Sequence, residues 1–227
     1  MSEFDATSTA PVVRAFTGTP ATSGRRRREI TSDRIVDAAA QLFSERGYNA
    51  SPVADLAAAA GISRATFYIH FPTRGDLILA LMRRLRPTLL ASILRLDDLP
   101  PTAAAVRGWL DELADLWSVH LGIFNALHEA LVSEPAVGIE WVDLVTDAAT
   151  SMRRTVARNA AVVGEEHAVQ AIYTMLLGTD HVIQMASFAR RTEELGPTLD
   201  VLAQQWVTAA LVLHPDQAGT APATPPP

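Results

Sequence analysis

The most informative stretch of the sequence is GISRATFYIHFPTRGDL, at residues 61–77. It places four side chains with hydrogen-bond donors close together: Arg64, Thr66, Tyr68 and His70. An Arg guanidinium can donate two parallel hydrogen bonds to guanine O6 and N7, a contact worth about 1–3 kcal/mol of discrimination between bases. A short helix that carries Arg64 and its neighbours therefore predicts contact with DNA.

The same stretch offers the two other kinds of DNA contact. Methyl groups that can pack on thymine methyls are expected from Ala65, Thr66 and Ile69. Phosphate contacts position a protein without reading the sequence, and we expect them from polar groups of Ser51, Ser63, Thr66, Tyr68, His70, Thr73 and Arg74. These residues alone leave one alternative open, which is a solvated polar face with no nucleic-acid partner.

Three short helices, over about 31–46, 52–60 and 63–71, are predicted to position these side chains. Their ends carry residues that favour helix termini: caps at Thr31, Ser51 and Ser63, Pro52 at a first helical position, and terminating glycines at Gly47 and Gly61. Phe67 and Phe71 are four residues apart and should face inward. The tight AGIS connection is typical of a helix-turn-helix, whose second helix lies in the DNA major groove.

A run of four arginines, Arg25, Arg26, Arg27 and Arg28, precedes the first predicted helix in the segment GRRRRE. N-terminal arms of helix-turn-helix proteins reach into the neighbouring minor groove. Each phosphate neutralised in this way contributes about −0.9 to the salt slope of binding. We expect a basic arm of this kind, and a solvated charge run is the alternative.

The string GISRATFYIHFPTRGDL resembles the signature of the TetR family of bacterial transcriptional regulators, and RIVDAAAQLFSERGYNASPVADLAAAAG resembles the family's first two helices. The resemblance covers about residues 30–85. It implies an all-α protein of about nine helices, with an N-terminal helix-turn-helix DNA-binding domain and a C-terminal helical ligand-binding and dimerisation domain. The sequence departs from the family pattern at Arg74, where Lys is usual, at Ala54, where many members have Arg, and at Gly75.

Composition and the resemblance together divide the chain. Residues 1–23 and 214–227 are rich in Thr, Ser, Ala and Pro and are expected to be disordered tails. Between them we expect a DNA-binding domain with its basic arm at 24–72 and a ligand-binding and dimerisation domain at 73–213. The helices expected in the second domain span about 73–96, 102–118, 120–132, 137–163, 166–192 and 198–213.

The last predicted helix carries an apolar stripe at helical spacing: Leu199, Leu202, Trp206, Ala209, Ala210 and Leu213. In the family the last two helices pair with those of a second subunit, so the resemblance implies a homodimer through this stripe. Two half-sites read by symmetry also extend the few base pairs that one recognition helix reads. Packing of the stripe inside its own subunit is the alternative.

Bulky side chains of the second domain are candidates to line a ligand pocket, although aromatic residues at helical spacing also form ordinary cores. A narrower resemblance, carried by GWLDELADLW, IEWVDLV, MASFA and LAQQWVTAALV, is to the EthR-like subgroup of the family and implies an apolar, aromatic tunnel. The candidates are Trp109, Trp117, Phe124, Trp141, Tyr173, Leu177, Asp180 and Trp206. Leu177 and Asp180 stand where polar Asn residues are expected, and Asp180 with His181 favours a basic or donor-bearing ligand.

Several classes of function are disfavoured. The chain of 227 residues has no Cys, so neither disulfides nor thiolate metal sites can form. The spacing of His120, His128 and His181 fits no metal motif, and we expect no metal and no cofactor. No GxSxG motif or glycine-rich phosphate loop occurs, so an enzyme is not expected. No apolar segment has the length of a signal peptide or a membrane span, which predicts a cytoplasmic protein.

The formal net charge of −6 hides an asymmetry, because the acidic excess lies after residue 76. A domain that can approach a polyanion is thus joined to one that a polyanion repels. The expected function is a repressor that binds a palindromic double-stranded operator as a dimer and is released by a small apolar or amphipathic effector. The alternatives are an activator of the same fold, or a helical small-molecule-binding protein or enzyme that keeps the helix-turn-helix as scaffold.

Overall fold

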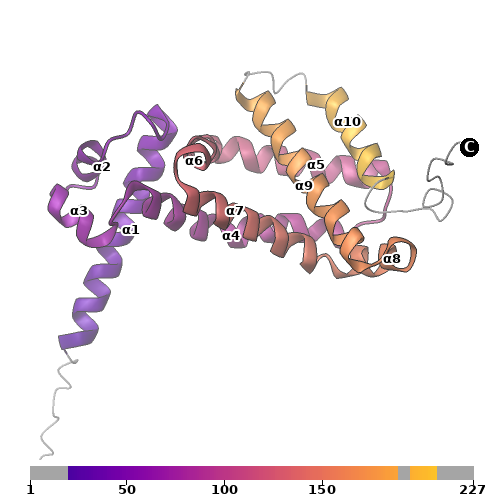
Figure 1. The fold of residues 1–227 in the computed structure, drawn as a ribbon. Helices are drawn as coiled ribbons and strands as arrows, with labels where there is room; N and C mark the ends of the chain where they lie inside the picture. The colour runs from indigo at the N-terminus through magenta and orange to yellow at the C-terminus, as the bar shows by residue number, and fades with distance from the viewer. Residues whose placement is uncertain (1–19, 189–194, 209–227) are drawn as a thin grey trace, which may run out of the picture.

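The computed structural model describes residues 20–188 and 195–208 (Figure 1). These two ranges contain ten α-helices and no strand, and the predicted all-α fold class is confirmed. The helices are α1 (Pro20–Arg46), α2 (Val53–Ala59), α3 (Arg64–His70), α4 (Arg74–Asp98), α5 (Ala103–Val119), α6 (Leu121–Ser133), α7 (Pro135–Ser151), α8 (Arg153–Val163), α9 (Glu165–Phe188) and α10 (Leu195–Trp206).

Helices α1 to α3 pack around a small aromatic core. Phe43, Tyr48, Leu56 and Phe67 are each at most 1% exposed. Phe67 and Phe71 face inward as predicted, because side chains four residues apart share one face of a helix. Their burial leaves the opposite face of α3 free, and Figure 1 shows α2 and α3 together on one side of α1.

Helix α1 begins at Pro20, so the predicted start near Thr31 is wrong. Thr31 does not cap the helix, since its Oγ1 donates to the carbonyl of Arg27 at 3.0 Å, one turn back within α1. Arg and Glu are good helix formers, and proline suits the first helical position, so the GRRRRE segment continues the helix. The predicted basic arm is therefore a helical extension that projects from the body of the protein (Figure 1), and residues 20–23 are helical.

Helix α4 leads from the unit of α1 to α3 into the second group of helices, the expected second domain, and packs there against α5, α6, α7 and α8. It continues through Pro87, which ends or breaks helices in many contexts. Its buried residues include Leu81, Leu89 and Ile93, which join one apolar core with residues of the later helices. No helix in the two described ranges has the length and apolar character needed to cross a membrane.

The predicted helix over 137–163 is two helices, α7 and α8, which separate at Met152. The reason is a contact from another element. The carboxylate of Asp97, at the end of α4, accepts hydrogen bonds from the backbone N–H groups of Arg154 (3.0 Å) and Thr155 (2.7 Å). It thereby satisfies the free donors that begin α8. The local sequence contains no Gly or Pro at this break, so the pattern alone predicted one helix.

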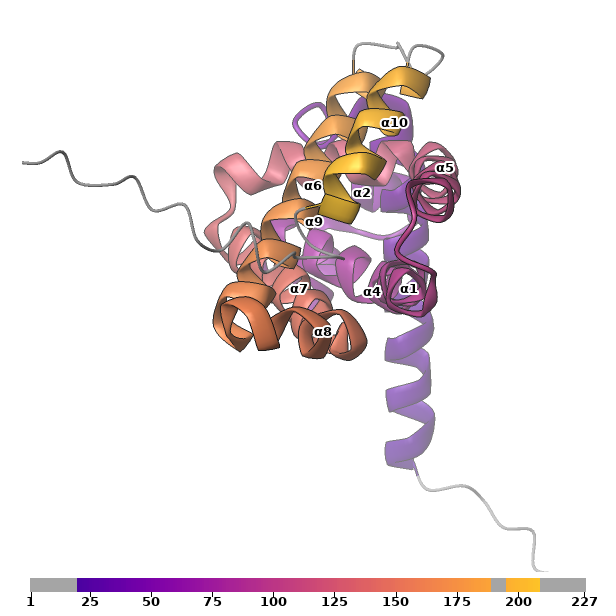
Figure 2. The ribbon, with the colours of Figure 1, turned by 90° about the vertical axis from the view of Figure 1, so that its right-hand side faces the viewer.

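The apolar stripe of α10 faces its own subunit, and its prediction as the dimer seam is wrong for the described part. Leu199, Leu202 and Trp206 are at most 5% exposed, and α10 packs mainly on α5, with further contacts to α9. Figures 1 and 2 both show α9 and α10 side by side. Ala209, Ala210 and Leu213 of the predicted stripe lie outside the described residues.

Candidate DNA-binding face and ligand cavity

Side-chain caps fix the segment that carries the predicted DNA contacts. At the start of α3, Ser63 Oγ accepts a hydrogen bond from the N–H of Thr66 at 3.1 Å, as predicted for a cap. At the start of α4, Thr73 Oγ1 accepts from the N–H of Asp76 at 3.0 Å, and the Asp76 carboxylate accepts from the N–H of Thr73 at 2.9 Å. This reciprocal capping box satisfies two free donors and fixes the turn after α3.

One face of α3 is directed to solvent. Arg64, Ala65, Tyr68 and Ile69 are exposed, and 46% of Tyr68 and 64% of Ile69 are accessible. Large apolar groups gathered on an exposed face are typical of a contact surface. Thr66 and His70 are half-buried beside them, and Thr66 Oγ1 lies 2.9 Å from Ser63 Oγ. The predicted base-contacting residues are thus brought together on one face.

The helical arm meets the end of this face. Arg28 Nη2 donates a hydrogen bond to the carbonyl of Ile69 at 3.1 Å. Burial, together with the positive charge of Arg28, lowers the pKa of His70, so this ring is neutral at neutral pH and can donate one N–H. Arg26 and Arg27 are exposed on the same extension. Arg25 lies in α1, but its side chain is outside the described residues.

Two predicted phosphate contacts are not supported by the structure. Ser51 is completely buried, and its hydroxyl donates to the carbonyl of Gly47 at 2.7 Å instead of capping α2. Arg74 Nη1 donates to the carbonyls of Tyr48 (3.0 Å) and Ser51 (3.3 Å), and its guanidinium lies 4.2 Å from the centre of the Tyr48 ring. Both side chains hold the turn between α1 and α2, a role that only the tertiary structure reveals.

The same turn is anchored to the second domain by α6. The hydroxyl of Tyr48 donates to Glu134 Oε1 at 2.6 Å, and the N–H of Asn49 donates to Glu129 Oε2 at 2.8 Å. Burial, and next the hydrogen bond to Glu134, raise the pKa of Tyr48 and keep the hydroxyl as a neutral donor. Two carboxylates near the C-terminal end of α6 therefore hold the segment that leads into the helix-turn-helix.

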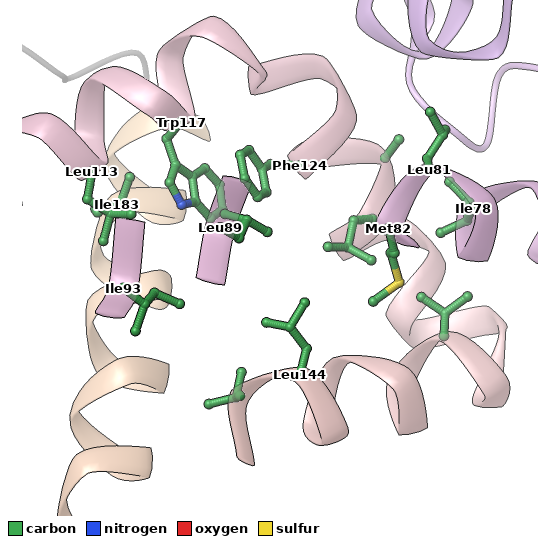
Figure 3. Close-up of a cluster of buried hydrophobic side chains, with 14 of the residues drawn as sticks. Ile78, Leu81, Met82, Leu89, Ile93, Leu113, Trp117, Phe124, Leu144 and Ile183 are labelled. Carbon is green, nitrogen blue, oxygen red and sulfur yellow. The ribbon is translucent and has the colours of Figure 1, made fainter. Parts of the chain in front are cut away.

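Helix α6 also borders an apolar cavity in the second domain. Two adjoining hollows contain about 310 and 440 Å³ of empty space, part of it open to solvent. Both are lined by Leu89, Phe124, Trp141 and Leu144. Figure 3 shows side chains from α4, α5, α6 and α7 around this region. Little of the space is wide enough for a water molecule, so a ligand enters only if side chains move.

The larger hollow has one polar side. Thr179 and Asp180 of α9 line it, and Asp180 Oδ2 lies 3.1 Å from Nε2 of His128 on α6. The other ring nitrogen of His128 is 2.8 Å from the carbonyl oxygen of Phe124. Trp117 stacks on Phe124, with 4.0 Å between ring centroids. This arrangement can bind a molecule that is mostly apolar and carries one polar group.

Residues 35–81 match the family model described as bacterial regulatory proteins, tetR family. This part of the chain is therefore similar to the regulators of that family. The matched residues run from α1 through α2 and α3 into α4. They therefore include the exposed face of α3.

The chain is similar to the transcriptional repressor LfrR of Mycolicibacterium smegmatis, with 34% identity over 98 residues that cover 43% of this chain and 51% of LfrR. It is also similar to the transcriptional activator FasR of the same species, with 28% identity over 140 residues that cover 58% of this chain and 62% of FasR. The chain spans about a quarter to a half of the length of the first curated relatives it matches. These relatives are named as regulators, in agreement with the expectation of a regulator and not an enzyme.

A solved structure of a putative tetR-family regulator from Mesorhizobium loti shares the fold, with a TM-score of 0.58. The likeness covers 80% of this chain and 96% of that protein, at 18% sequence identity. Identity at this level shows the fold alone. The fold therefore extends beyond the matched domain into the helices that enclose the cavity.

Four of the eight predicted ligand residues line the larger hollow: Trp117, Phe124, Trp141 and Asp180. Trp109 and Trp206 instead pack edge to face in the core, 5.6 Å apart, and their indole N–H groups donate to Ser92 O and Thr179 Oγ1. Tyr173 and Leu177 pack against the core outside the lining of both hollows. Helical spacing predicts which side chains are buried, but not which of them border a cavity.

The sequence excluded His128 as a metal ligand but did not predict its contact with Asp180. The available signal was a single His four residues after Phe124, on the apolar face of LGIFNALHEALV. Tyr48, Glu129 and Glu134 were also missed, and their sequence neighbourhood contains no signal that pairs them. Within the part of the chain that the structure describes, no three His, Cys, Asp or Glu residues gather as a metal site.

Proposed function

We propose that the protein is a transcriptional repressor that binds a palindromic operator as a homodimer and is released by a small, mostly apolar ligand. The observation that carries the proposal is the exposed face of α3. Arg64 lies in its first turn, Tyr68 and Ile69 follow one turn later, and the arm with Arg26 and Arg27 is adjacent. Recognition helices place their N-terminal residues against base edges in this way. Such a regulator acts in the cytoplasm of a bacterium.

The proposed contacts divide into two kinds. Arg64 reads guanine, and the methyl groups of Ala65, Thr66 and Ile69 pack on thymine. Phosphates are bound by polar groups around the same face: Ser63, Tyr68, His70, Thr73 and the arginines of the arm. Large parts of the Tyr68 and Ile69 side chains are exposed to solvent, which supports a partner outside the subunit.

The dimer is proposed to use faces of α9 and α10 that the subunit leaves uncovered. Thr174, Gly178 and Met185 are exposed along one side of α9. Val201 and Gln205 are exposed on α10, opposite its buried stripe, and Val201 is 59% accessible. A Cβ added at Gly178 would meet nothing within 4 Å, which leaves room for a second helix to approach closely. Two such helix pairs form a four-helix bundle.

Release is proposed to act through α6. This helix presents Phe124 to the cavity. Glu129 of the same helix, and Glu134 directly after its end, accept hydrogen bonds from the turn before α2. A ligand that shifts α6 therefore acts on the helix-turn-helix. To change operator occupancy from nearly full to nearly empty, the ligand must prefer the released conformation by about 10⁴-fold, or about 5.5 kcal/mol.

The test is a gel shift of the purified protein on the DNA immediately upstream of its own coding region, at several salt concentrations. We expect a shifted band that requires a palindrome in the DNA. We expect Arg64→Ala to cost about 1–3 kcal/mol of specific binding. The double variant Arg64→Ala with Tyr68→Ala should lose specific binding while keeping its fold. Arg153→Ala is the matched control, because Arg153 is exposed on α8, far from α3 (Figure 1). Equal, sequence-independent binding by the wild type and the double variant would refute the proposal.

An activator of the same fold is the second candidate, because the match to FasR covers a larger share of this chain than the match to LfrR. A reporter joined to the protected DNA separates the two. Removal of the regulator raises transcription if it represses and lowers transcription if it activates.

A further inference from the structure

The sequence after α3 removes donors that would satisfy the last carbonyl groups of this helix. The final carbonyls of an α-helix have no partner within the helix itself. Pro72 has no N–H group with which to continue α3. In a longer helix the N–H of Thr73 would bond the carbonyl of Ile69. Here that N–H donates to the Asp76 carboxylate at 2.9 Å, as part of the capping box of α4, so the carbonyl of Ile69 needs a donor from another element.

Arg28 of α1 supplies this donor. Its Nη2 donates to the carbonyl oxygen of Ile69 at 3.1 Å. A positive charge beside the C-terminal end of a helix also interacts favourably with the helix dipole. The side chain of Ile69 belongs to the exposed face of α3. Arg28 therefore holds the backbone of a residue that we propose to contact bases.

A second arginine of α1 holds the end of α2 in the same way. Arg34 Nη2 donates at 2.9 Å to the carbonyl of Ala60, the residue directly after α2. Two arginines of one helix thus bond the C-terminal ends of both helices of the helix-turn-helix. Helix α2 packs more extensively on α1 than α3 does. The direction of α3 relative to α1 therefore depends more strongly on its side-chain contact.

This contact distinguishes Arg28 from the neighbouring arginines of the arm. Arg26 and Arg27 are exposed on the same helix. Adjacent residues of an α-helix point about 100° apart, so Arg27 and Arg28 are directed to different sides of α1. Each arginine adds one positive charge near the DNA, which strengthens binding to every duplex alike. The bond to Ile69 additionally connects Arg28 to the direction of the α3 face.

We propose that Arg28 is a positioning residue for operator recognition, whose hydrogen bond to Ile69 fixes the direction of the exposed face of α3 and thereby raises the discrimination between the operator and other DNA. Arg28 acts through α3 and not through contact with a base. This inference rests on the proposed function, since it assigns a specificity-determining residue to the same DNA-binding face.

The experiment compares Arg28→Ala with Arg27→Ala, which removes the same charge from the neighbouring position. Fluorescence anisotropy measures binding of each full-length variant to the palindromic duplex and to a scrambled duplex of equal length, at several salt concentrations. Both variants should bind scrambled DNA more weakly by the same factor, with a salt slope reduced in magnitude by up to about 0.9. Arg28→Ala should also lower the ratio of operator affinity to scrambled affinity by about three- to tenfold, as expected for one lost hydrogen bond. Arg27→Ala should leave this ratio unchanged.

A conservative variant separates position from charge. Arg28→Lys keeps the positive charge and N–H donors, so it should keep the salt slope and recover part of the affinity ratio. Circular dichroism and thermal melting show that each variant is folded, as expected for an exposed side chain. The proposal is overturned if folded Arg28→Ala keeps the wild-type ratio, or if Arg27→Ala lowers the ratio equally.

A measurement without DNA tests the contact itself. Burial lowers the pKa of His70, and the positive charge of Arg28 lowers it further. Arg28→Ala should therefore raise the pKa of His70 in an NMR titration, and Arg27→Ala should raise it less. An unchanged pKa of His70 in Arg28→Ala would show that Arg28 does not lie at the end of α3, and this too would overturn the inference.

The two measurements separate this inference from the proposed function. If the wild type prefers its operator and Arg28→Ala keeps that preference, the inference fails and the proposed function stands. If the wild type binds every duplex equally while Arg28→Ala still raises the pKa of His70, the proposed function fails and the recognition role of Arg28 fails with it. The contact between Arg28 and α3 is then a feature of the fold alone.

Discussion

Tyr48 joins the two domains through one buried hydroxyl, whose oxygen lies 2.6 Å from Glu134 Oε1. We predict that Tyr48→Phe lowers the free energy of unfolding by about 1.5–3 kcal/mol, because it removes a hydrogen bond to a charged acceptor. The apolar contacts of the ring and its position beneath Arg74 are retained. Urea unfolding measures the change. Tyr68→Phe is the control, because Tyr68 is exposed. The free energy of unfolding of this variant should lie within about 0.5 kcal/mol of the wild-type value.

The raised pKa of Tyr48 adds a dependence on pH. The folded protein holds the neutral phenol more strongly than the unfolded chain does. The corresponding stability is fully present below the ordinary Tyr pKa, near 10, and is lost as pH rises above it. Tyr48→Phe should lose less stability than the wild type over that alkaline range. An equal decline in both proteins would show that Tyr48 does not titrate in this way.

Single residues also mark the limit of prediction from the sequence. The exposed face of α3 was predicted correctly because Phe67 and Phe71 fix which side is buried, and helical geometry then places Arg64, Tyr68 and Ile69. Ser51 and Arg74 were assigned wrongly because their partners are backbone carbonyls of a turn whose path the local pattern does not contain. Side-chain type indicates what a residue can bind, and tertiary structure decides what it does bind.

Between elements, the contact of α1 with α6 depends on a glycine. A Cβ added at Gly122 would overlap the backbone and side chain of Ser44, so the two helices can approach this closely at that position only because it is a glycine. We predict that Gly122→Ala destabilises the protein by about 1–3 kcal/mol, as overpacking does. Gly138→Ala is the matched control, because nothing lies within 4 Å of its added Cβ; it should stabilise α7 by about 0.5–1 kcal/mol. Denaturant unfolding of both variants measures whether each change lowers or raises the free energy of unfolding. If both variants were destabilised by the same amount, the close contact of Gly122 with Ser44 would not explain the effect.

The helices themselves were largely predictable from the sequence, but the start of α1 and the break before α8 were not. Gly47 and Gly61 end α1 and the turn after α2 with positive φ, as their position in the sequence predicted. The start of α1 was placed too late because Thr31 is a good cap by type, yet its hydroxyl bonds within the helix. The break before α8 was missed because its cap comes from Asp97, more than fifty residues earlier in the chain.

For the whole molecule, the apolar stripe of α10 illustrates a general ambiguity. Periodicity shows that Leu199, Leu202 and Trp206 need a covering surface, but it does not say whether α5 of the same chain or a helix of another chain provides it. Within one subunit, α5 covers the stripe. The partner subunit that we propose would therefore use the opposite side of α10 and the neighbouring side of α9, around Gly178.

We accordingly predict that Gly178→Arg disrupts the dimer, because a long charged side chain occupies the space that a second helix needs. Gly108→Arg is the control on α5, where the glycine is exposed and an added Cβ also meets nothing within 4 Å. Sedimentation equilibrium should show a monomer for the first variant and the wild-type mass for the second. Because each half-site then binds alone, operator affinity of Gly178→Arg should fall toward non-specific binding, a loss on the order of 10³-fold or more. A dimeric Gly178→Arg protein with unchanged operator affinity would place the subunit interface on another surface.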